Sequence, residues 1–307
     1  MRTTFVICAV IGALFAALVS TSLAPTEAAA NANADMAKYL GYWNYDQPNE
    51  LTLNNVSVLA CPDGTGACDR ALPLPLRVPQ VGWELFTPGP NGTVNGTSDQ
   101  GCTWNFKVTR TGLELSSTTQ QCFNPAVGSW GNLTKWNVQV KGNRETEQIT
   151  AISHQPDGVD LIGTMKTGSR TKVVPGRDGG KFIHGFVGDY TRTPADMHSL
   201  VNVAVTDQGM AYPAQDALHI TADRAAKGRI NAHTADGCNW SFSVRGNTAE
   251  LDPATQTCHT ETGDLTLLYW AMATDDGRHI NDFLHGTITR PGMPTSNVYL
   301  YSGLLAR

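Results

Sequence analysis

The chain has 307 residues, of which 41% are hydrophobic and 16% charged, and its net charge at pH 7 is −5. This apolar content and low charge exclude an intrinsically disordered chain. With 22 Lys and Arg against 27 Asp and Glu, the sequence lacks the basic surplus of nucleic-acid-binding proteins, so we expect no nucleic-acid partner. The length fits about two domains, and the 30 Gly and 16 Pro predict many turns between short strands.

Residues 1–34 have the layout of a secretory signal peptide. Arg2 precedes an apolar run of fifteen residues, Phe5–Val19, which is too short to span a bilayer comfortably. Ala32-Asn33-Ala34 matches a cleavage site, and Ala28-Ala29-Ala30 is a second candidate. The alternative is a membrane anchor. We expect a secreted chain, extracellular or in the cell envelope, with no membrane span after cleavage.

The cysteines also favour export, because six remain after cleavage and an even number predicts disulfide bonds. The spacing predicts three pairs: Cys61–Cys68, Cys102–Cys122 and Cys238–Cys258. The second and third pairs share a separation of twenty residues. No metal-ligand spacing occurs, so we expect neither a metal nor another cofactor.

An internal repeat divides the chain into two units. Residues 101–122 align with 237–258 without a gap, with ten identities in 22 positions. We therefore expect four segments: a signal peptide at 1–34, one unit at 35–165, a linker at 166–181 and a second unit at 182–307. The linker is expected where Thr, Gly, Ser and Pro form turn-rich sequence. The segment around Cys61–Cys68 is expected to be a loop inserted in the first unit only.

Apolar residues alternate with polar ones in the repeated segments, as they do in half-buried strands. Trp104, Phe106 and Val108 share one face, and Trp240, Phe242 and Val244 repeat the pattern. Convincing amphipathic helices are absent. We expect an all-β fold with two tandem homologous units, each an eight-stranded β-barrel of lipocalin or avidin size, or a β-sandwich.

Two short motifs resemble known proteins. Gly41-Tyr42-Trp43 is similar to the Gly-x-Trp opening of the first strand in lipocalins and avidins (calycins), although the terminal helix of lipocalins is not evident. The duplicated Cys-x-Trp-x-Phe pattern, followed by Thr-Gln-x-Cys, resembles uncharacterised exported domains of actinobacteria and myxobacteria. That resemblance implies a bacterial secreted protein and no known activity.

The segment 265–273, LTLLYWAMA, is apolar on both faces. A strand buried on both sides needs a second covering surface. We expect this cover to be the other unit or a partner chain. The alternative is a strand beneath a long loop.

Catalytic motifs are not found, and the polar residues have ordinary structural interpretations. Glu114 and Glu250 occupy equivalent positions and are expected to pair with Lys107 and Arg245 across a hairpin, exposed to solvent. The segment Asp99-Gln100-Gly101 is interpreted as a tight turn.

Aromatic residues are the candidate ligand contacts. Trp104 and Trp240 recur beside the disulfides and are interpreted as core. The predicted ligand-binding residues are Trp43, Trp83, Tyr269 and Trp270. Together these observations favour a secreted protein that binds a small apolar or glycan ligand in a barrel lumen or an inter-unit cleft. The alternatives are an enzyme on a barrel scaffold (an isomerase, cyclase or hydrolase) and an adhesion or structural module of the cell envelope.

Overall fold

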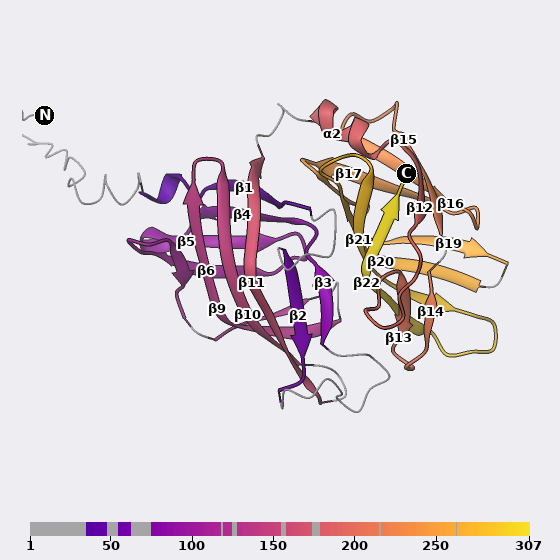
Figure 1. Ribbon diagram of the computed structural model, residues 1–307, viewed down its shortest axis with the longest axis horizontal. Coiled ribbons are helices and arrows are strands. Elements are labelled where there is room, and N and C mark those ends of the chain that lie inside the picture. Colours follow the sequence, from indigo (N-terminus) through magenta and orange to yellow (C-terminus); the bar gives the residue numbers. More distant parts are fainter. Residues whose placement is uncertain are drawn as a thin grey trace, which may run out of the picture.

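The computed structural model describes residues 35–47, 55–62, 75–117, 119–124, 128–154, 158–173, 179–214, 216–261 and 263–307. Two β-barrels lie side by side (Figure 1). In each, eight antiparallel strands form a closed ring and three further strands are attached to it. The predicted all-β fold with two homologous units is therefore confirmed, in its barrel form.

Barrel 1 closes where its first strand pairs with its last, β1 with β11. Its ring consists, in order, of β1 (Gly41–Tyr45), β4 (Trp83–Pro88), β5 (Thr93–Ser98), β6 (Thr103–Val108), β7 (Leu113–Leu115), β9 (Ser129–Lys141), β10 (Arg144–His154) and β11 (Asp160–Val173). The hairpin β2 (Val56–Ala60) and β3 (Leu76–Pro79) extends from β11, and β8 (Gln120–Asn124) pairs with β9. A 3-10 turn, η1 (Pro90–Gly92), joins β4 to β5.

Barrel 2 repeats this order strand by strand. Its ring consists of β12 (Gly188–Arg192), β15 (Ala217–Ala222), β16 (Arg229–Thr234), β17 (Asn239–Arg245), β18 (Thr248–Leu251), β20 (Gly263–Ala273), β21 (His279–Thr289) and β22 (Ser296–Ala306). The hairpin β13 (Val203–Thr206) and β14 (Ala211–Pro213) extends from β22, and β19 (Gln256–Thr260) pairs with β20. Helix α2 (Gly179–Phe186) precedes the ring.

Strand β11 continues to Val173 and so runs into the segment 166–181, whose turn-rich sequence predicted a linker. The physical reason is that Gly168 and Arg170 are buried, alternating with more exposed neighbours, which is strand periodicity. The inserted loop of the first unit falls between β2 and β3, and residues 63–74 lie outside the described residues.

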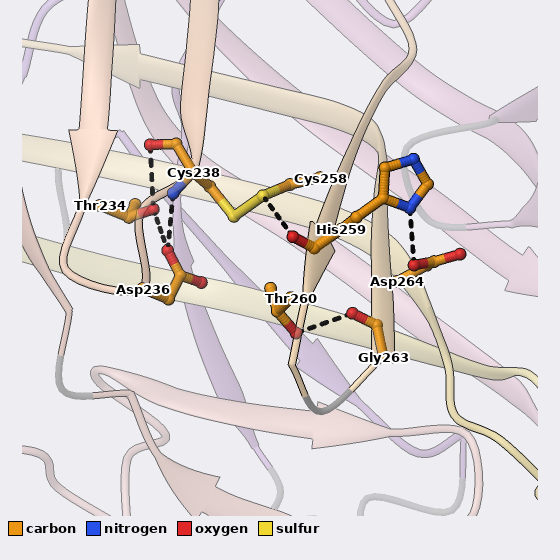
Figure 2. The surroundings of a disulfide bond; sticks show 8 residues. All are labelled: Thr234, Asp236, Cys238, Cys258, His259, Thr260, Gly263 and Asp264. Atoms are coloured by element: carbon orange, nitrogen blue, oxygen red, sulfur yellow. Dashed lines mark hydrogen bonds and ion pairs between the residues drawn. A yellow bond between two sulfur atoms is a disulfide. The ribbon is translucent and has the colours of Figure 1, made fainter.

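Two of the predicted disulfides are confirmed, Cys102–Cys122 and Cys238–Cys258, each with a Cα–Cα distance of 5.7 Å. The predicted pair Cys61–Cys68 stays a prediction, because Cys68 lies outside the described residues. Each confirmed bridge joins the residue before a ring strand to a strand outside the ring: Cys102 precedes β6 and Cys122 lies on β8, while Cys238 precedes β17 and Cys258 lies on β19. In barrel 2 the turn before Cys238 is held by Asp236, which accepts a hydrogen bond from the Cys238 N–H at 3.2 Å (Figure 2).

Each barrel has its own apolar core, which the predicted alternation supplies. Trp104 and Phe106 belong to the core of barrel 1, and Trp240 and Phe242 to that of barrel 2. Both members of each pair point inward because every second side chain of a strand faces the same side. The interpretation of the repeated tryptophans as core residues agrees with this packing.

A third apolar cluster joins the barrels. It consists of Leu76, Val78 and Val81 from barrel 1 with Leu200, Val203, Ala271, Ala273 and Phe283 from barrel 2. Strand β20 supplies Trp270 and Met272 to the core of barrel 2 and Ala271 and Ala273 to this contact. The cover expected for the segment 265–273 is therefore barrel 1. Polar contacts add to it, because the Asn44 side chain donates to the Arg245 carbonyl at 2.6 Å and Asn247 donates to the Tyr45 carbonyl at 2.8 Å.

Candidate functional site

The candidate site is a cavity of about 280 Å³ in barrel 1, with part of its wall contributed by barrel 2. Ring strands of barrel 1, the β2–β3 hairpin, and Phe283 and Tyr301 of barrel 2 line it. The larger apolar side chains that barrel 1 contributes to this lining are Leu59, Leu76, Val78, Val81, Trp83, Trp104, Leu133, Trp136, Ile149, Ile152, Leu161 and Met165. The volume is just below the range of roughly 300–1,000 Å³ that is typical of small-molecule sites, which are also concave and mainly apolar.

Two carboxyl groups interrupt this apolar lining, those of Glu84 and Asp99. Glu84 lies on β4 and is only 2% exposed. Its Oε1 atom is buried and has no hydrogen-bond partner, while Oε2 is 3.8 Å from Nη1 of Arg170. Burial raises the pKa of Glu84 well above its usual value, and the nearby Arg170 guanidinium only partly opposes this shift. Of the three glutamates that pair with Arg170, Glu84 is therefore the one whose carboxylate lies farthest from the guanidinium.

A buried ion cluster adjoins the cavity at Glu84. Arg170, on β11, is fully buried and forms ion pairs with Glu145 and Glu147 of β10, the latter at 2.5 Å. The indole N–H of Trp136 donates to Glu147 at 2.7 Å. Burial raises the pKa of Glu145 to about 8, although Arg170 lowers it. One buried guanidinium therefore faces three buried glutamates.

The second acid of the lining, Asp99, lies in the turn between β5 and β6. Its carboxylate accepts a hydrogen bond from the Tyr269 hydroxyl of barrel 2, and its N–H donates to the Trp83 carbonyl at 3.1 Å. Burial raises the pKa of Asp99 to about 7, while the hydrogen bond from Tyr269 lowers it. The tight turn predicted here is present, and it also places a carboxyl group in the cavity wall.

The expectation of a solvent-exposed Glu250 is wrong. Its carboxyl group is enclosed at the barrel–barrel contact, with Oε1 buried and without a hydrogen bond. Burial and then the Asp99 carboxylate raise the pKa of Glu250 to about 8. The cause is the contact with barrel 1, because Arg245 lies over the Tyr42 and Trp83 rings of that barrel instead of being free in solvent. The equivalent pair Lys107 and Glu114 is exposed as expected, at 3.3 Å.

The structure separates the four predicted ligand-binding residues into two groups. Trp83 lines the cavity, and Tyr269 contacts its Asp99 wall. Trp43 is buried in the core of barrel 1, where its N–H donates to the Tyr39 carbonyl at 2.6 Å. Trp270 is buried in the core of barrel 2. Only Trp83 and Tyr269 are therefore placed at this site.

The acids and Arg170 were not identified from the sequence as site residues. One signal was available: Glu145 and Glu147 are two residues apart and pair with Val140 and Val138, which alternate with polar residues along β9. Arg170 had no such signal, because its neighbours Thr167-Gly168-Ser169 are typical of a turn.

Within the described residues, no helix has both the length and the apolar character needed to cross a membrane. In the same part of the chain, no group of three or more His, Cys, Asp or Glu side chains is arranged as a metal site.

Comparison with known proteins finds similarity at the level of solved structures only. No protein-family model matches the sequence, and no curated protein matches it either. One similar structure is a protein of unknown function of the DUF3598 family from Nostoc punctiforme, with a TM-score of 0.26 and 11% identity, covering 89% of this chain and 97% of that one. Another is a candidate outer membrane protein from Bacteroides fragilis, with a TM-score of 0.25 and 11% identity, covering 89% of this chain and 99% of that one.

Proposed function

We propose that this chain is an exported binding protein that takes a small, mainly apolar molecule into the cavity of barrel 1. The observation that carries the proposal is the cavity of about 280 Å³ with an apolar wall and two convergent carboxyl groups, Glu84 and Asp99. Binding sites have this composition, with a few polar groups fixing the orientation of the ligand in an apolar pocket. The mainly apolar lining favours an apolar ligand over a glycan.

Barrel 2 has a supporting role in this proposal. Its residues Phe283 and Tyr301 complete the wall of the cavity, and Phe283 also belongs to the apolar cluster between the barrels. The cavity thus combines a barrel lumen with an inter-unit contact, the two places where a ligand was expected. The two disulfides support the proposal of export, because such bonds persist in oxidising compartments.

The test is a screen of small neutral aromatic and aliphatic molecules by ligand-observed NMR, followed by titration of the tryptophan fluorescence. Ala151 lines the cavity, so Ala151→Phe should occupy the volume and abolish binding of any molecule found. The matched control is Gln148→Phe, which adds the same ring at an exposed position of the same strand, β10. Binding that survives Ala151→Phe would place the site elsewhere.

An enzyme that transfers protons is a second candidate, favoured by one residue. Asp99 lies in the cavity wall and its pKa is raised to about 7, the range in which a carboxyl group serves as acid and base at neutral pH. A bound molecule would then exchange a carbon-bound proton with D2O, or be converted, in an NMR time course. Asp99→Asn should stop this reaction while the molecule still binds, and a bound molecule that remains unchanged with the native protein would contradict the enzyme.

A further inference from the structure

The two barrels provide an internal comparison for the buried ion cluster, because their strands pair in the same registers. Both contain a buried tryptophan whose N–H donates to a carboxylate on the next strand: Trp136 to Glu147 at 2.7 Å, and Trp270 to Asp282 at 3.0 Å. In both, that carboxylate pairs with an arginine; Arg192 meets Asp282 at 2.8 Å. The carboxylate therefore belongs to the shared scaffold, whereas the arginine that pairs with it comes from different strands, Arg170 from β11 and Arg192 from β12.

Barrel 1 adds acids to this scaffold that barrel 2 lacks. In the strand register of barrel 1, Glu84 lies opposite Trp43, and in barrel 2 Leu218 lies opposite Tyr190. In the same way Glu145 lies opposite Arg170, and Ile280 lies opposite Leu305. Asp99 lies three residues before Cys102, as Ala235 lies before Cys238. The three counterparts are thus Leu218, Ile280 and Ala235. Leu218 and Ile280 are buried in the apolar core of barrel 2, so the fold itself does not require acids at these positions.

Barrel 1 also makes room for one of these acids. Gly96 on β5 corresponds to Ala232 on β16, because each is paired with the repeated tryptophan, Trp104 or Trp240. A Cβ atom at Gly96 would lie 2.6 Å from Oε1 of Glu84, 2.8 Å from a ring carbon of Phe86 and 2.9 Å from one of Phe106, all closer than real Cβ atoms approach. The missing methyl group therefore accommodates Glu84 together with these two rings.

The added groups are all acids, and this indicates the charge of the ligand. Three glutamates surround Arg170, which is enclosed by them and does not line the cavity. An anionic ligand would therefore meet Glu84 and Asp99 rather than the guanidinium. A cationic group would meet Glu84 Oε1, a buried acceptor without a hydrogen-bond partner, in a cavity whose lining includes the aromatic ring of Trp104. The faces of aromatic rings attract cations, and the guanidinium of Arg170 already lies over the Tyr45 and Trp136 rings.

We propose that the ligand of the barrel 1 cavity is a small organic cation, a protonated amine on an apolar body, whose ammonium group donates a hydrogen bond to the carboxylate of Glu84. The inference rests on the proposed binding function. A charge-assisted hydrogen bond of this kind is about twice as strong as a neutral one. It would give the orphan oxygen a donor and favour the ionised form of Glu84, which burial otherwise disfavours.

The experiment compares three probes of one shape and different charge: 2-phenylethylamine as its ammonium, 2-phenylethanol and phenylacetate. Binding to the full chain at pH 8 is measured by isothermal titration calorimetry. We expect the ammonium to bind at least about tenfold more tightly than the alcohol, and phenylacetate not to bind. Calorimetry in buffers of different ionisation enthalpy should show proton release with the ammonium and none with the alcohol.

Two variants separate the inference from the proposed function. Glu84→Gln should weaken the ammonium about tenfold or more and leave the alcohol within about twofold. Glu114→Gln, which changes an exposed acid of the same barrel, should affect neither. If the alcohol binds as tightly as the ammonium, or Glu84→Gln weakens both equally, the cationic ligand is refuted and a binding function stands. If no probe binds and the neutral screen is also empty, both proposals fail.

Discussion

Replacement of Arg170 by methionine tests whether the buried ion cluster of barrel 1 is held together by this single cation. The guanidinium is fully buried and pairs with Glu145, Glu147 and Glu84. Methionine keeps much of the volume and removes the charge, which leaves carboxylates buried without compensation. Breaking a buried pair in this way costs roughly 3–5 kcal/mol, which corresponds to a fall in the melting temperature of about 6–20 °C for domains of this size.

The pH dependence of this loss has a definite sign. The uncompensated acids can escape the cost by taking up protons, and burial already raises the pKa of Glu145 to about 8. The deficit in the free energy of unfolding should therefore be largest above pH 8 and shrink toward pH 5. Urea unfolding at both pH values, followed by tryptophan fluorescence, measures the deficit.

The matched control is Arg229→Met. Arg229 makes an ion pair with Asp252 at 2.5 Å, but both side chains are partly exposed to solvent. A surface pair contributes about 0–1 kcal/mol, so the control should lose little stability at either pH. An Arg170→Met variant that lost no more than the control, or lost the same amount at pH 5 and pH 8, would refute the account of the cluster.

The features that the sequence predicted correctly are those set by local spacing. The period of two in Trp104-x-Phe106-x-Val108 determines which face of a strand is buried wherever the strand pairs. The common separation of twenty residues between Cys102 and Cys122, and between Cys238 and Cys258, identified both bridges because the two units share one hairpin. The barrels follow from the same repetition, since strands with one apolar face must close or find a second sheet.

The features that the sequence did not predict depend on contacts between distant segments. Asp99 looks like an ordinary turn residue until the hydroxyl of Tyr269, 170 residues away, is brought to it. Glu250 loses its solvent because the other barrel covers it. Arg170 looked like part of a linker because local composition records turn propensity and not charge pairing across a closed ring. Predictions from local sequence therefore failed mainly for residues at or near the cavity. Functional sites are where such failures are expected, because their residues do not follow the pattern that stabilises the rest of the fold.

Three further predictions follow from the buried acids, the disulfides and the duplication. The pKa values of Asp99 and Glu250 in the folded chain are raised to about 7 and about 8, so the folded chain binds more protons than the unfolded one. The free energy of unfolding should therefore fall as pH rises from about 4 to 8, by up to roughly 1.4 kcal/mol per pH unit for each group. Asp99→Asn should flatten this slope in urea titrations. Removing the Cys238–Cys258 bridge with paired serines should cost about 3 kcal/mol of unfolding free energy, measured against the same change at Cys102–Cys122.

The last prediction uses barrel 2 as the template for barrel 1, because Arg192 and Leu305 occupy the positions of Tyr45 and Arg170. The variant that transfers the barrel 2 arrangement carries Tyr45→Arg, Glu84→Leu, Glu145→Ile and Arg170→Leu. Its new arginine should pair with Glu147, and exchanging buried charges for packed apolar side chains should leave the chain as stable or more stable by about 1–4 kcal/mol. The same variant should no longer bind 2-phenylethylamine, since it lacks Glu84. A variant less stable than Arg170→Met alone would show that the acids hold barrel 1 together, whereas a stable variant without amine binding would show that they serve the ligand.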